Sequence, residues 1–492
     1  MNFRLILYII GQILRAEGLL MLIPLACSLI YRESSWFTIL IPILIILALA
    51  TLLTWRRPAK HDRLGVRDGL FIVGVSWVVL SLFGMLPFIL SGTISHPVNA
   101  FFETVSGFTT TGATVLGEAI GTMPEDLPRG IALWRSLTHW IGGMGILVFV
   151  LAVMPQQEFK SARLMHAMRA EVPGPTASKV VATLRRSAAI TYAIYVALTL
   201  LEVIFLLCGG LPLYESVLHA FSTAGTGGFS NMNASVGAFD SAYIHWVITA
   251  FMLLFSINFN LYYLILIGQA SRALLSEELR WFGIIVSAST ALITLNILPQ
   301  FDSFGNALQH AAFNVASFMS TTGYTTVAYD NWPQLSQTIL FLLMFIGGCA
   351  GSTCGGLKIG RWIILIKSSL RELRYTLRPR EVRAVRAEGK PVDEDVVRGT
   401  QTYFSLFMVF FGASALAFAA LDNVDLLTSI SAVTTCMNNV GPGFGKIGML
   451  AGGSFGGFST AAKLLLSFDM LLGRLEIFPV LILFMPPTWA KK

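Results

Sequence analysis

Four short segments of this chain end in glycine turns whose backbone oxygens could coordinate a cation. The turns contain Gly112, Gly225, Gly323 and Gly441. Glycine permits backbone angles that direct successive carbonyl oxygens toward a common axis, and a ring of such oxygens can replace the water shell of a small cation. The expected ligand residues are Thr110, Thr111 and Gly112 in the first turn, Thr223, Ala224 and Gly225 in the second, Thr321, Thr322 and Gly323 in the third, and Asn439, Val440 and Gly441 in the fourth.

The spacing of these turns indicates a repeated structural unit. The four glycines are 113, 98 and 118 residues apart, which leaves room in each copy for two membrane-spanning helices and one shorter helix. The shorter helix would point the partially negative end of its dipole at the cation. One glycine turn alone is better explained as a packing site between helices, but four copies in one register predict a four-sided pore. The fourth copy, with two asparagines and Pro442, predicts that this pore is asymmetric.

The composition is that of a membrane protein with several spans. Of 492 residues, 55% are hydrophobic and 12% are charged, and the mean hydropathy is +0.70. These values exclude an ordinary soluble domain. The net charge is +7, but the basic residues flank the apolar segments, so membrane topology explains them better than nucleic-acid binding does.

Apolar segments long enough to cross a bilayer, about 20 residues each, predict ten spans. Their approximate ranges are 4–31, 36–55, 69–91, 129–154, 188–208, 241–270, 281–299, 335–366, 402–420 and 457–487. Four runs of about a dozen residues are too short to span and suit re-entrant helices; they are 98–110, 213–223, 305–321 and 425–437. We therefore expect an all-α polytopic membrane protein with an accessory helix pair (1–60) and four pore units (61–160, 161–275, 276–370 and 371–492).

The loop charges predict the orientation of the chain. Lysine and arginine are concentrated in residues 56–67, 155–187, 367–400 and the tail Lys491–Lys492, and such loops stay in the cytoplasm. We therefore expect both termini to be cytoplasmic. The opposite loops contain acidic residues and one lysine, Lys446. They either form a vestibule that concentrates cations or are simply tolerated there. The acidic residues are Glu118, Glu125, Asp126, Asp240, Asp302, Asp330, Asp422 and Asp425.

A glycine-rich segment interrupts the eighth predicted span. So many glycines and small polar residues should break a helix, and irregular backbone at this depth must line a cavity or be packed in protein. We interpret it as a gate beneath the pore loops, with close helix packing as the alternative. A nucleotide P-loop ending at Lys358 is excluded because the required spacing is absent. The residues that define the segment are Gly347, Gly348, Gly351, Ser352, Thr353, Gly355 and Gly356.

Arg474 lies inside the last predicted span, where an unpaired charge costs at least about 2.5 to 3.5 kcal/mol. It either faces the pore or forms an ion pair, for example with Asp469. Lys463 could extend to the outer surface. His139, His219 and His310 lie near the short helices without a metal-binding spacing, and we expect them to be packing residues.

Other chemistries find little support in the sequence. The five cysteines are scattered through apolar sequence and should be free thiols. There is no nucleotide-binding motif, so we expect no nucleotide to bind to this chain itself. The absence of a nucleophile elbow and of a zinc-binding helix argues against an intramembrane enzyme. The apolar N-terminal segment from Leu5 to Tyr31 is too long for a signal peptide and should remain as a span.

Several motifs together carry a family resemblance across nearly the whole chain. They are Phe101–Gly112 (FFETVSGFTTTG), Trp134–Gly145 (WRSLTHWIGGMG), Thr223–Phe229 (TAGTGGF), the glycine-rich stretch Gly347–Lys358, and Gly473–Glu476 (GRLE). The chain resembles the membrane subunit of the Trk potassium-uptake system, in the superfamily that includes the Ktr and plant HKT transporters.

This resemblance implies a potassium-uptake protein of the bacterial cytoplasmic membrane. It implies four helix-loop-helix pore domains in one subunit, a homodimer with one pore per protomer, and control by a cytosolic nucleotide-binding subunit of the TrkA type. It also implies a gating loop at Gly347–Gly356 and a positive barrier at Arg474. In this family, glycine at the Gly112 position accompanies potassium preference. The alternative is a sodium-permeable relative, or a symporter that couples uptake to Na⁺ or H⁺.

Overall fold

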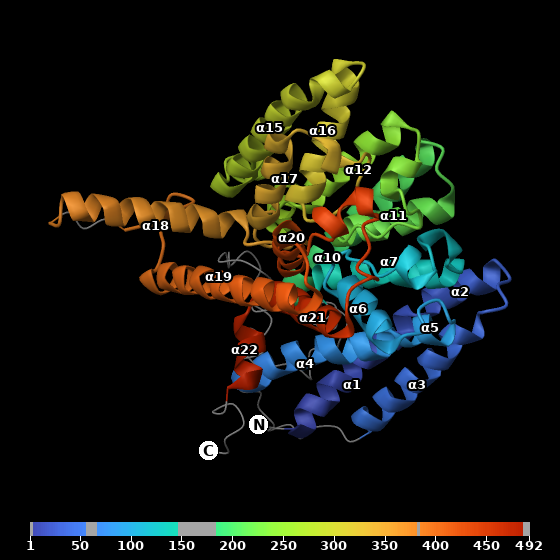
Figure 1. Cartoon of the computed structure of the whole chain (residues 1–492). Helices are drawn as coiled ribbons and strands as arrows, with labels where there is room; N and C mark the ends of the chain where they lie inside the picture. The colour runs from blue at the N-terminus through green and yellow to red at the C-terminus, as the bar shows by residue number, and fades with distance from the viewer. Residues whose placement is uncertain (1–2, 56–65, 146–183, 381–383, 486–492) are drawn as a thin grey trace.

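The computed structural model describes residues 3–55, 66–145, 184–380 and 384–485, and these ranges are almost entirely helical (Figure 1). The described residues form one antiparallel pair of two-residue strands, β1 (Arg386–Ala387) and β2 (Lys390–Pro391). The basic segments 56–65 and 155–183 and the Lys491–Lys492 tail lie outside the described residues. The expected all-α membrane fold is confirmed.

Helices fill the N-terminal half of the chain as follows: α1 (Phe3–Leu20), α2 (Leu22–Ile30), α3 (Phe37–Thr54), α4 (Val66–Gly84), α5 (Leu86–Leu90), α6 (Pro97–Phe108), α7 (Arg129–Met144), α10 (Leu184–Cys208), α11 (Leu213–Gly225), α12 (Ala242–Phe255) and α13 (Phe259–Leu266). The remaining helices are α14 (Ala270–Leu274), α15 (Glu277–Ile297), α16 (Phe304–Met319), α17 (Gln334–Ile346), α18 (Ile359–Leu377), α19 (Glu394–Asp422), α20 (Leu426–Met437), α21 (Thr460–Arg474) and α22 (Phe478–Phe484).

Within the described ranges, six helical segments are long and apolar enough to cross a membrane. They are Phe3–Ile30, Phe37–Thr54, Asp68–Leu90, Ala188–Cys208, Glu277–Gln300 and Glu394–Asp422. Three further predicted spans contain shorter helices: α7 ends at Met144, α17 ends at Ile346 and α21 ends at Arg474. After α7, the described residues stop at Gly145. At the end of α21 the chain turns through Glu476 and Ile477, whose φ angles are 59° and 48°.

The predicted span 241–270 is not one continuous helix. Helices α12 and α13 meet at an angle of 91°. The sequence stays apolar through the bend, so its hydropathy does not reveal it. The backbone groups at the bend form hydrogen bonds with residues outside these two helices. The carbonyl oxygen of Ser256 accepts from the amide of Cys349 at 2.9 Å, and the amide of Phe259 donates to the carbonyl oxygen of Gly351 at 3.2 Å. The glycine-rich segment therefore satisfies the backbone that the bend exposes.

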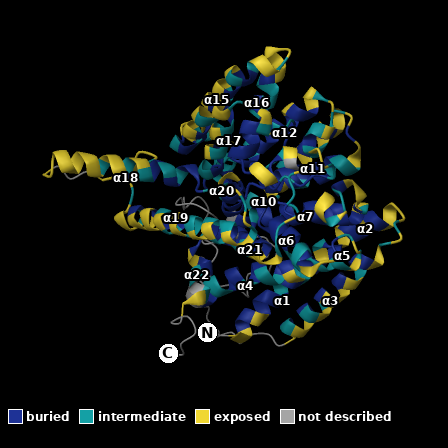
Figure 2. Cartoon of the chain, in the orientation of Figure 1, coloured by how far each residue is buried: buried dark blue, intermediate teal, exposed yellow. Residues whose placement is uncertain are grey.

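Four short helices occupy the places where the sequence predicts short helices. They are α6, α11, α16 and α20, and each packs against a longer neighbour. Figure 2 shows that buried residues are concentrated around α20 and α6, whereas the outer ends of α18 and α19 are exposed. The short helices thus lie inside a shell of longer ones.

The N-terminal helices attach to this shell at the start of α7. Glu33, in the turn after α2, accepts hydrogen bonds from the amides of Arg129 (2.5 Å) and Gly130 (3.2 Å). A carboxylate at a helix N-terminus satisfies free amides and favours the helix dipole. Helices α1 and α3 pack closely because Gly11 leaves room for Leu53 and Thr54.

Candidate functional site

Each of the four short helices leads into a loop with the same backbone conformation. In every loop, two residues separated by one position have positive φ angles between 54° and 99°. Residues with side chains rarely adopt such angles, so four matching pairs define one shared loop geometry. The pairs are Thr110 and Gly112, Thr226 and Gly228, Thr321 and Gly323, and Asn439 and Gly441.

One backbone hydrogen bond sets the register of each loop. The amide of the middle residue donates to the carbonyl oxygen five positions earlier, at 2.9 Å in all four loops. The bonds run from Thr111 to Ser106, from Gly227 to Ser222, from Thr322 to Ser317 and from Val440 to Thr435. The loop triplets are therefore 110–112, 226–228, 321–323 and 439–441.

The structure corrects the expected register of the second loop by three residues. Thr223, Ala224 and Gly225 form the last turn of α11. The helix ends at Thr226, which adopts the left-handed conformation with a φ of 54°. Thr226, Gly227 and Gly228 therefore occupy the loop, because α11 continues one turn beyond the point that the threonine-alanine-glycine pattern indicates.

The four loops close into a ring. At the glycine that ends each triplet, an added Cβ would overlap or crowd the carbonyl oxygen of a neighbouring loop, so the backbones are in close contact. The contacts pair Gly112 with Gly227, Gly228 with Thr322, Gly323 with Val440, and Gly441 with Thr111. Any side chain at these glycines must displace a carbonyl oxygen.

The atoms of this ring suit a weakly hydrated cation. The carbonyl oxygens in the contacts belong to uncharged residues, and such oxygens can replace a hydration shell without trapping the ion on a fixed anion. Thr110 Oγ1, Asn438 Oδ1 and Asn439 Oδ1 are buried and have no hydrogen-bond partner among the described residues. The ends of the four short helices add partial negative charge there.

A buried ion pair braces the first two loops, and sequence reasoning did not identify it. Arg135 Nε lies 2.6 Å from Glu103 Oε1, and both side chains are buried. Glu103 accepts a 2.8 Å hydrogen bond from the amide of Val115, just after the first loop. Arg135 donates to the carbonyl oxygen of Ser230 at 2.9 Å, and its guanidinium lies 3.5 Å from the ring centre of Phe229. Glu103 and Arg135 both belong to the motifs that carry the family resemblance, but only the folded structure shows that they pair.

The three histidines near the short helices differ in their contacts. His219 contacts the carbonyl oxygen of Glu215 through Nδ1 and the hydroxyl of Ser230 through Nε2, and His310 Nδ1 lies 2.9 Å from Thr326 Oγ1. These two are satisfied packing residues, as expected. The ring of His139 packs against the second loop and stacks on Phe229 at 4.0 Å, and its nitrogens have no hydrogen-bond partner among the described residues.

The glycine-rich segment is non-helical between α17 and α18, as expected, and contacts the underside of the ring. The amide of Gly355 donates to Thr321 Oγ1 at 2.7 Å. The amide of Gly356 donates to the carbonyl oxygen of Asn438 at 3.0 Å. Gly347, Gly351 and Gly356 have φ angles of 71° to 74°, a conformation that glycine adopts without strain. Gly348, Ser352 and Thr353 complete the segment, and Thr353 is fully buried.

Glu278 holds the glycine-rich segment from the start of α15. Its Oε1 accepts from the amide of Ala350 at 2.6 Å and from the amide of Gly360 at 3.0 Å. One carboxylate oxygen therefore joins the middle of the segment to the first turn of α18. The sequence offers little to identify this residue, because acidic side chains are common in the first turn of a helix.

Arg474 bonds backbone oxygens of both the glycine-rich segment and α7. Its guanidinium donates to the carbonyl oxygen of Thr353 at 2.9 Å, of Gly142 at 2.5 Å and of Gly143 at 2.7 Å. Asp469, the alternative partner, accepts a 2.8 Å hydrogen bond from Ser414. Arg474 thus ties the glycine-rich segment to the end of α7.

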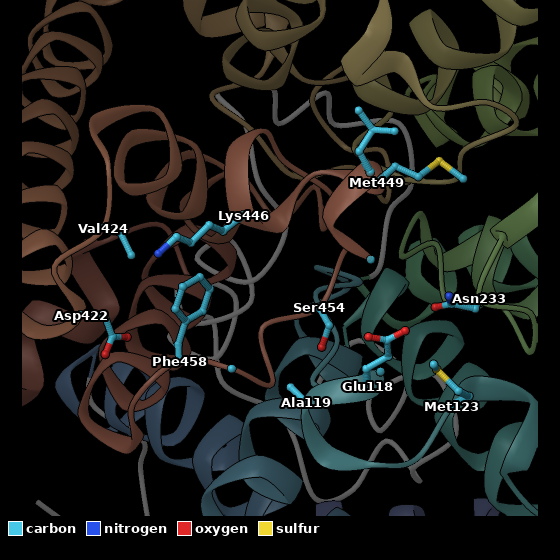
Figure 3. Close-up of a pocket in the computed structure, with 14 residues that line it drawn as sticks. Glu118, Ala119, Met123, Asn233, Asp422, Val424, Lys446, Met449, Ser454 and Phe458 are labelled. Atoms are coloured by element: carbon cyan, nitrogen blue, oxygen red, sulfur yellow. The ribbon is translucent and has the colours of Figure 1, made fainter.

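A cavity of about 810 Å³ opens on the other side of the molecule from the glycine-rich segment. Figure 3 shows Lys446 and Asp422 on one side of this cavity, and Glu118 and Asn233 on the other. The segment that follows the fourth loop lies beside the segment that follows the first loop, because the amide of Phe455 donates to the carbonyl oxygen of Thr114. The cavity therefore lies over segments that lead directly out of the ring.

Most of the acidic residues that the sequence predicts in outer loops have structural contacts. Each accepts a hydrogen bond from a backbone amide, which gives it a folding role beside its charge. The bonds link Glu125 to Asn233, Asp126 to Met123, Asp330 to Leu450, Asp422 to Ser459 and Asp425 to Thr428. Lys463 is buried and donates to Asn99 Oδ1 and the carbonyl oxygen of Gly456, both at 2.8 Å.

The space beneath the ring, next to the glycine-rich segment, is small. A small void lies between the fourth loop, the glycine-rich segment and the end of α21. The space left in it for water is about 10 Å³, the lower limit for a single water molecule. Its lining residues are Cys354, Gly355, Gly356, Lys358, Asn439, Gly473, Arg474 and Glu476.

Comparison with known proteins gives matches that span the chain. The TrkH family, described as cation transport proteins, matches residues 35–489. The Trk system potassium uptake protein TrkH of Salmonella typhimurium is 35% identical over 499 aligned residues, with 100% of both chains covered. The TrkH protein of Halomonas elongata is 33% identical, also over the full length of both chains. The crystal structure of the potassium transporter TrkH from Vibrio parahaemolyticus superposes with a TM-score of 0.88, at 32% identity and full coverage of both chains.

Proposed function

The chain belongs to the TrkH family of cation transport proteins, and from this premise we propose that it carries potassium ions across the cytoplasmic membrane through the ring of four loops. It is a multi-pass membrane protein, and its relatives are named as transporters, not enzymes. The observation that carries the proposal is the closed ring, in which four loops of one conformation bring uncharged carbonyl oxygens together.

In the proposed mechanism, a potassium ion enters the outer cavity and exchanges its water for oxygens of the ring. The filter residues are Thr110, Thr111, Gly112, Thr226, Gly227, Gly228, Thr321, Thr322, Gly323, Asn439, Val440 and Gly441. Close contact between neighbouring backbones supports a filter whose width resists change. Selectivity then follows from the number and spacing of carbonyl oxygens.

The glycine-rich segment acts as the gate in this proposal, and Arg474 supplies an electrostatic barrier. Two observations support these roles: the segment bonds the underside of the ring, and the void between them has space for about one water at most. Moving the segment away would break the Arg474 bond to Thr353 and open the passage. Deleting Gly347–Gly356 should therefore raise flux.

The proposed assembly is a homodimer with cytoplasmic termini, controlled by a cytosolic TrkA-type nucleotide-binding subunit. The names of the curated relatives, proteins of a Trk system, support the involvement of other components. Helix α18 projects from the molecule in Figure 1, is exposed along its outer part in Figure 2 and contains several basic residues, so a cytosolic partner could contact it.

The decisive experiment measures ⁸⁶Rb⁺ uptake into liposomes that contain the purified protein, with K⁺ or Na⁺ as competitor. We expect K⁺ to compete strongly and Na⁺ weakly, and we expect Gly112→Ser to lose this discrimination. Equal competition by Na⁺ in the unmutated protein would favour a sodium-permeable transporter. Uptake that requires a Na⁺ or H⁺ gradient would favour a symporter.

A further inference from the structure

Lys358, the last residue of the glycine-rich segment, lies where a fixed positive charge would obstruct a cation. It precedes α18, its side chain is only 1% exposed, and it lines the small void beneath the ring together with Asn439 and Arg474. Its ammonium group donates a hydrogen bond to the carbonyl oxygen of Cys354. A cation that leaves the ring past Asn439 therefore meets two positive side chains.

The neighbouring acid does not cancel both charges. Glu476 also lines the void, but its Oε2 lies 2.7 Å from Nη2 of Arg361, whose guanidinium lies 4.2 Å from the ring centre of Tyr403. Glu278 is a second carboxylate that acts on Lys358, and it accepts from two backbone amides of this region. Three positive side chains, Lys358, Arg474 and Arg361, therefore face two carboxylates, and the local charge is positive. Charges in a site with little water interact strongly, so this region repels a permeating cation.

The two positive residues differ in their attachment. Arg474 belongs to a helix and bonds the end of α7 as well as the glycine-rich segment. Lys358 belongs to the segment itself and has a φ angle of 70°, a conformation that is unfavourable for a residue with a side chain. A movement of the segment therefore carries Lys358 with it, and a long lysine side chain can extend toward water at the membrane surface.

We infer that Lys358 is a mobile blocking charge of the gate: in the closed arrangement it occupies the exit of the ring, and opening of the segment withdraws it. This inference rests on the proposed function. It separates the gate into two parts, because the glycine backbone closes the passage sterically while Lys358 repels the cation.

The test compares ⁸⁶Rb⁺ uptake by the purified full-length protein in liposomes, without any partner subunit. We expect Lys358→Gln, which keeps a hydrogen-bond donor and removes the charge, to raise flux about tenfold, as a barrier about 1.4 kcal/mol lower would. Lys358→Met should act similarly, and Lys358→Arg should stay closed. Lys390→Gln, which removes an exposed charge from β2, is the matched control and should not change flux.

The readings distinguish this inference from the proposed function. Because the ring is unchanged, Lys358→Gln should retain the preference for Rb⁺ over Na⁺. Flux equal to the unmutated protein in both neutral variants would overturn the blocking role while leaving potassium transport intact. Equal increases in Lys358→Gln and Lys358→Arg would also overturn it, because they would indicate a loss of packing and not of charge. If the unmutated protein itself fails to prefer Rb⁺ over Na⁺, the proposed filter is wrong, whatever Lys358 does.

Discussion

Arg135 of α7 and Glu103 of α6 form a buried ion pair that connects the two segments leaving the first and second loops. The Nε to Oε1 distance is 2.6 Å, and each partner also holds a backbone group just beyond its loop, at Val115 and Ser230. The two partners are 32 residues apart in the sequence, and through them the position of the first loop is coupled to that of the second.

Removing one member of this pair should destabilise the protein and disturb ion discrimination. Glu103→Gln leaves the buried charge of Arg135 without its partner, and Arg135→Met leaves that of Glu103 without its partner. Either change should lower the free energy of unfolding by about 3 to 5 kcal/mol. Thermal unfolding in detergent and the ratio of Rb⁺ to Na⁺ uptake measure the two effects. The double variant should lose less than the sum of the single losses. Glu118→Gln, an exposed acid of the outer cavity, is the control, and single variants as stable as this control would contradict the bracing role.

The register of the second loop is directly testable. Gly228→Ser places a side chain against the carbonyl oxygen of Thr322 and should reduce discrimination between Rb⁺ and Na⁺ about tenfold, equivalent to about 1.4 kcal/mol. Thr223→Val changes only a helical residue whose hydroxyl bonds the carbonyl oxygen of His219, and it should leave discrimination intact. Competition between the two ions in liposomes measures both variants. Loss of selectivity in Thr223→Val but not in Gly228→Ser would restore the register that the sequence pattern favours.

The short helices were predictable because an apolar run of a dozen residues is too short to span and has to end inside the protein. The residue at which α11 ends was not predictable. The stretch Thr223–Gly228 offers three glycines and two threonines, and only the left-handed conformation of Thr226 decides where the helix stops. The bend after Phe255 was also hidden, because its cause is a set of hydrogen bonds to Cys349 and Gly351, nearly a hundred residues away. Local pattern thus predicts which elements form, whereas their endpoints depend on distant partners.

The cap of α20 gives a pH-dependent contribution to stability. Asp425 accepts from the hydroxyl and the amide of Thr428, and these hydrogen bonds hold the pKa of Asp425 below its ordinary value. The stabilisation is therefore complete above the ordinary pKa of about 3.9 and is lost as pH falls through the lower folded value. Asp425→Ala should cost about 1 kcal/mol at neutral pH, measured by thermal unfolding. Asp425→Asn keeps the cap but does not titrate, so the advantage of aspartate over asparagine should begin to shrink as pH falls below about 3.9. A constant difference down to pH 3 would exclude this cap as a titrating contributor.

Neutralising Arg474 should open the gate partly. Arg474→Gln loses charged hydrogen bonds to Thr353, Gly142 and Gly143, each worth about 1.5 to 3 kcal/mol. We expect higher ⁸⁶Rb⁺ flux in liposomes without a partner subunit. Arg474→Lys should restore closure only partly, because an ammonium group cannot replace the planar fork that reaches several carbonyl oxygens. Flux no higher than in the unmutated protein would show that Arg474 has no part in closure.

Glu278 should act on the proposed gate from the start of α15. Glu278→Ala leaves the amides of Ala350 and Gly360 without their acceptor, and an unsatisfied buried donor costs about 1 to 3 kcal/mol. The closed arrangement loses this stabilisation, so we expect increased flux in the same liposome assay. Glu278→Gln keeps one acceptor oxygen and should have an intermediate effect. The neighbouring Glu277 pairs with Lys367 on α18 and makes neither of these two bonds, so Glu277→Gln is the matched control. Equal flux in Glu278→Ala and Glu277→Gln would mean that the carboxylate of Glu278 does not hold the segment closed.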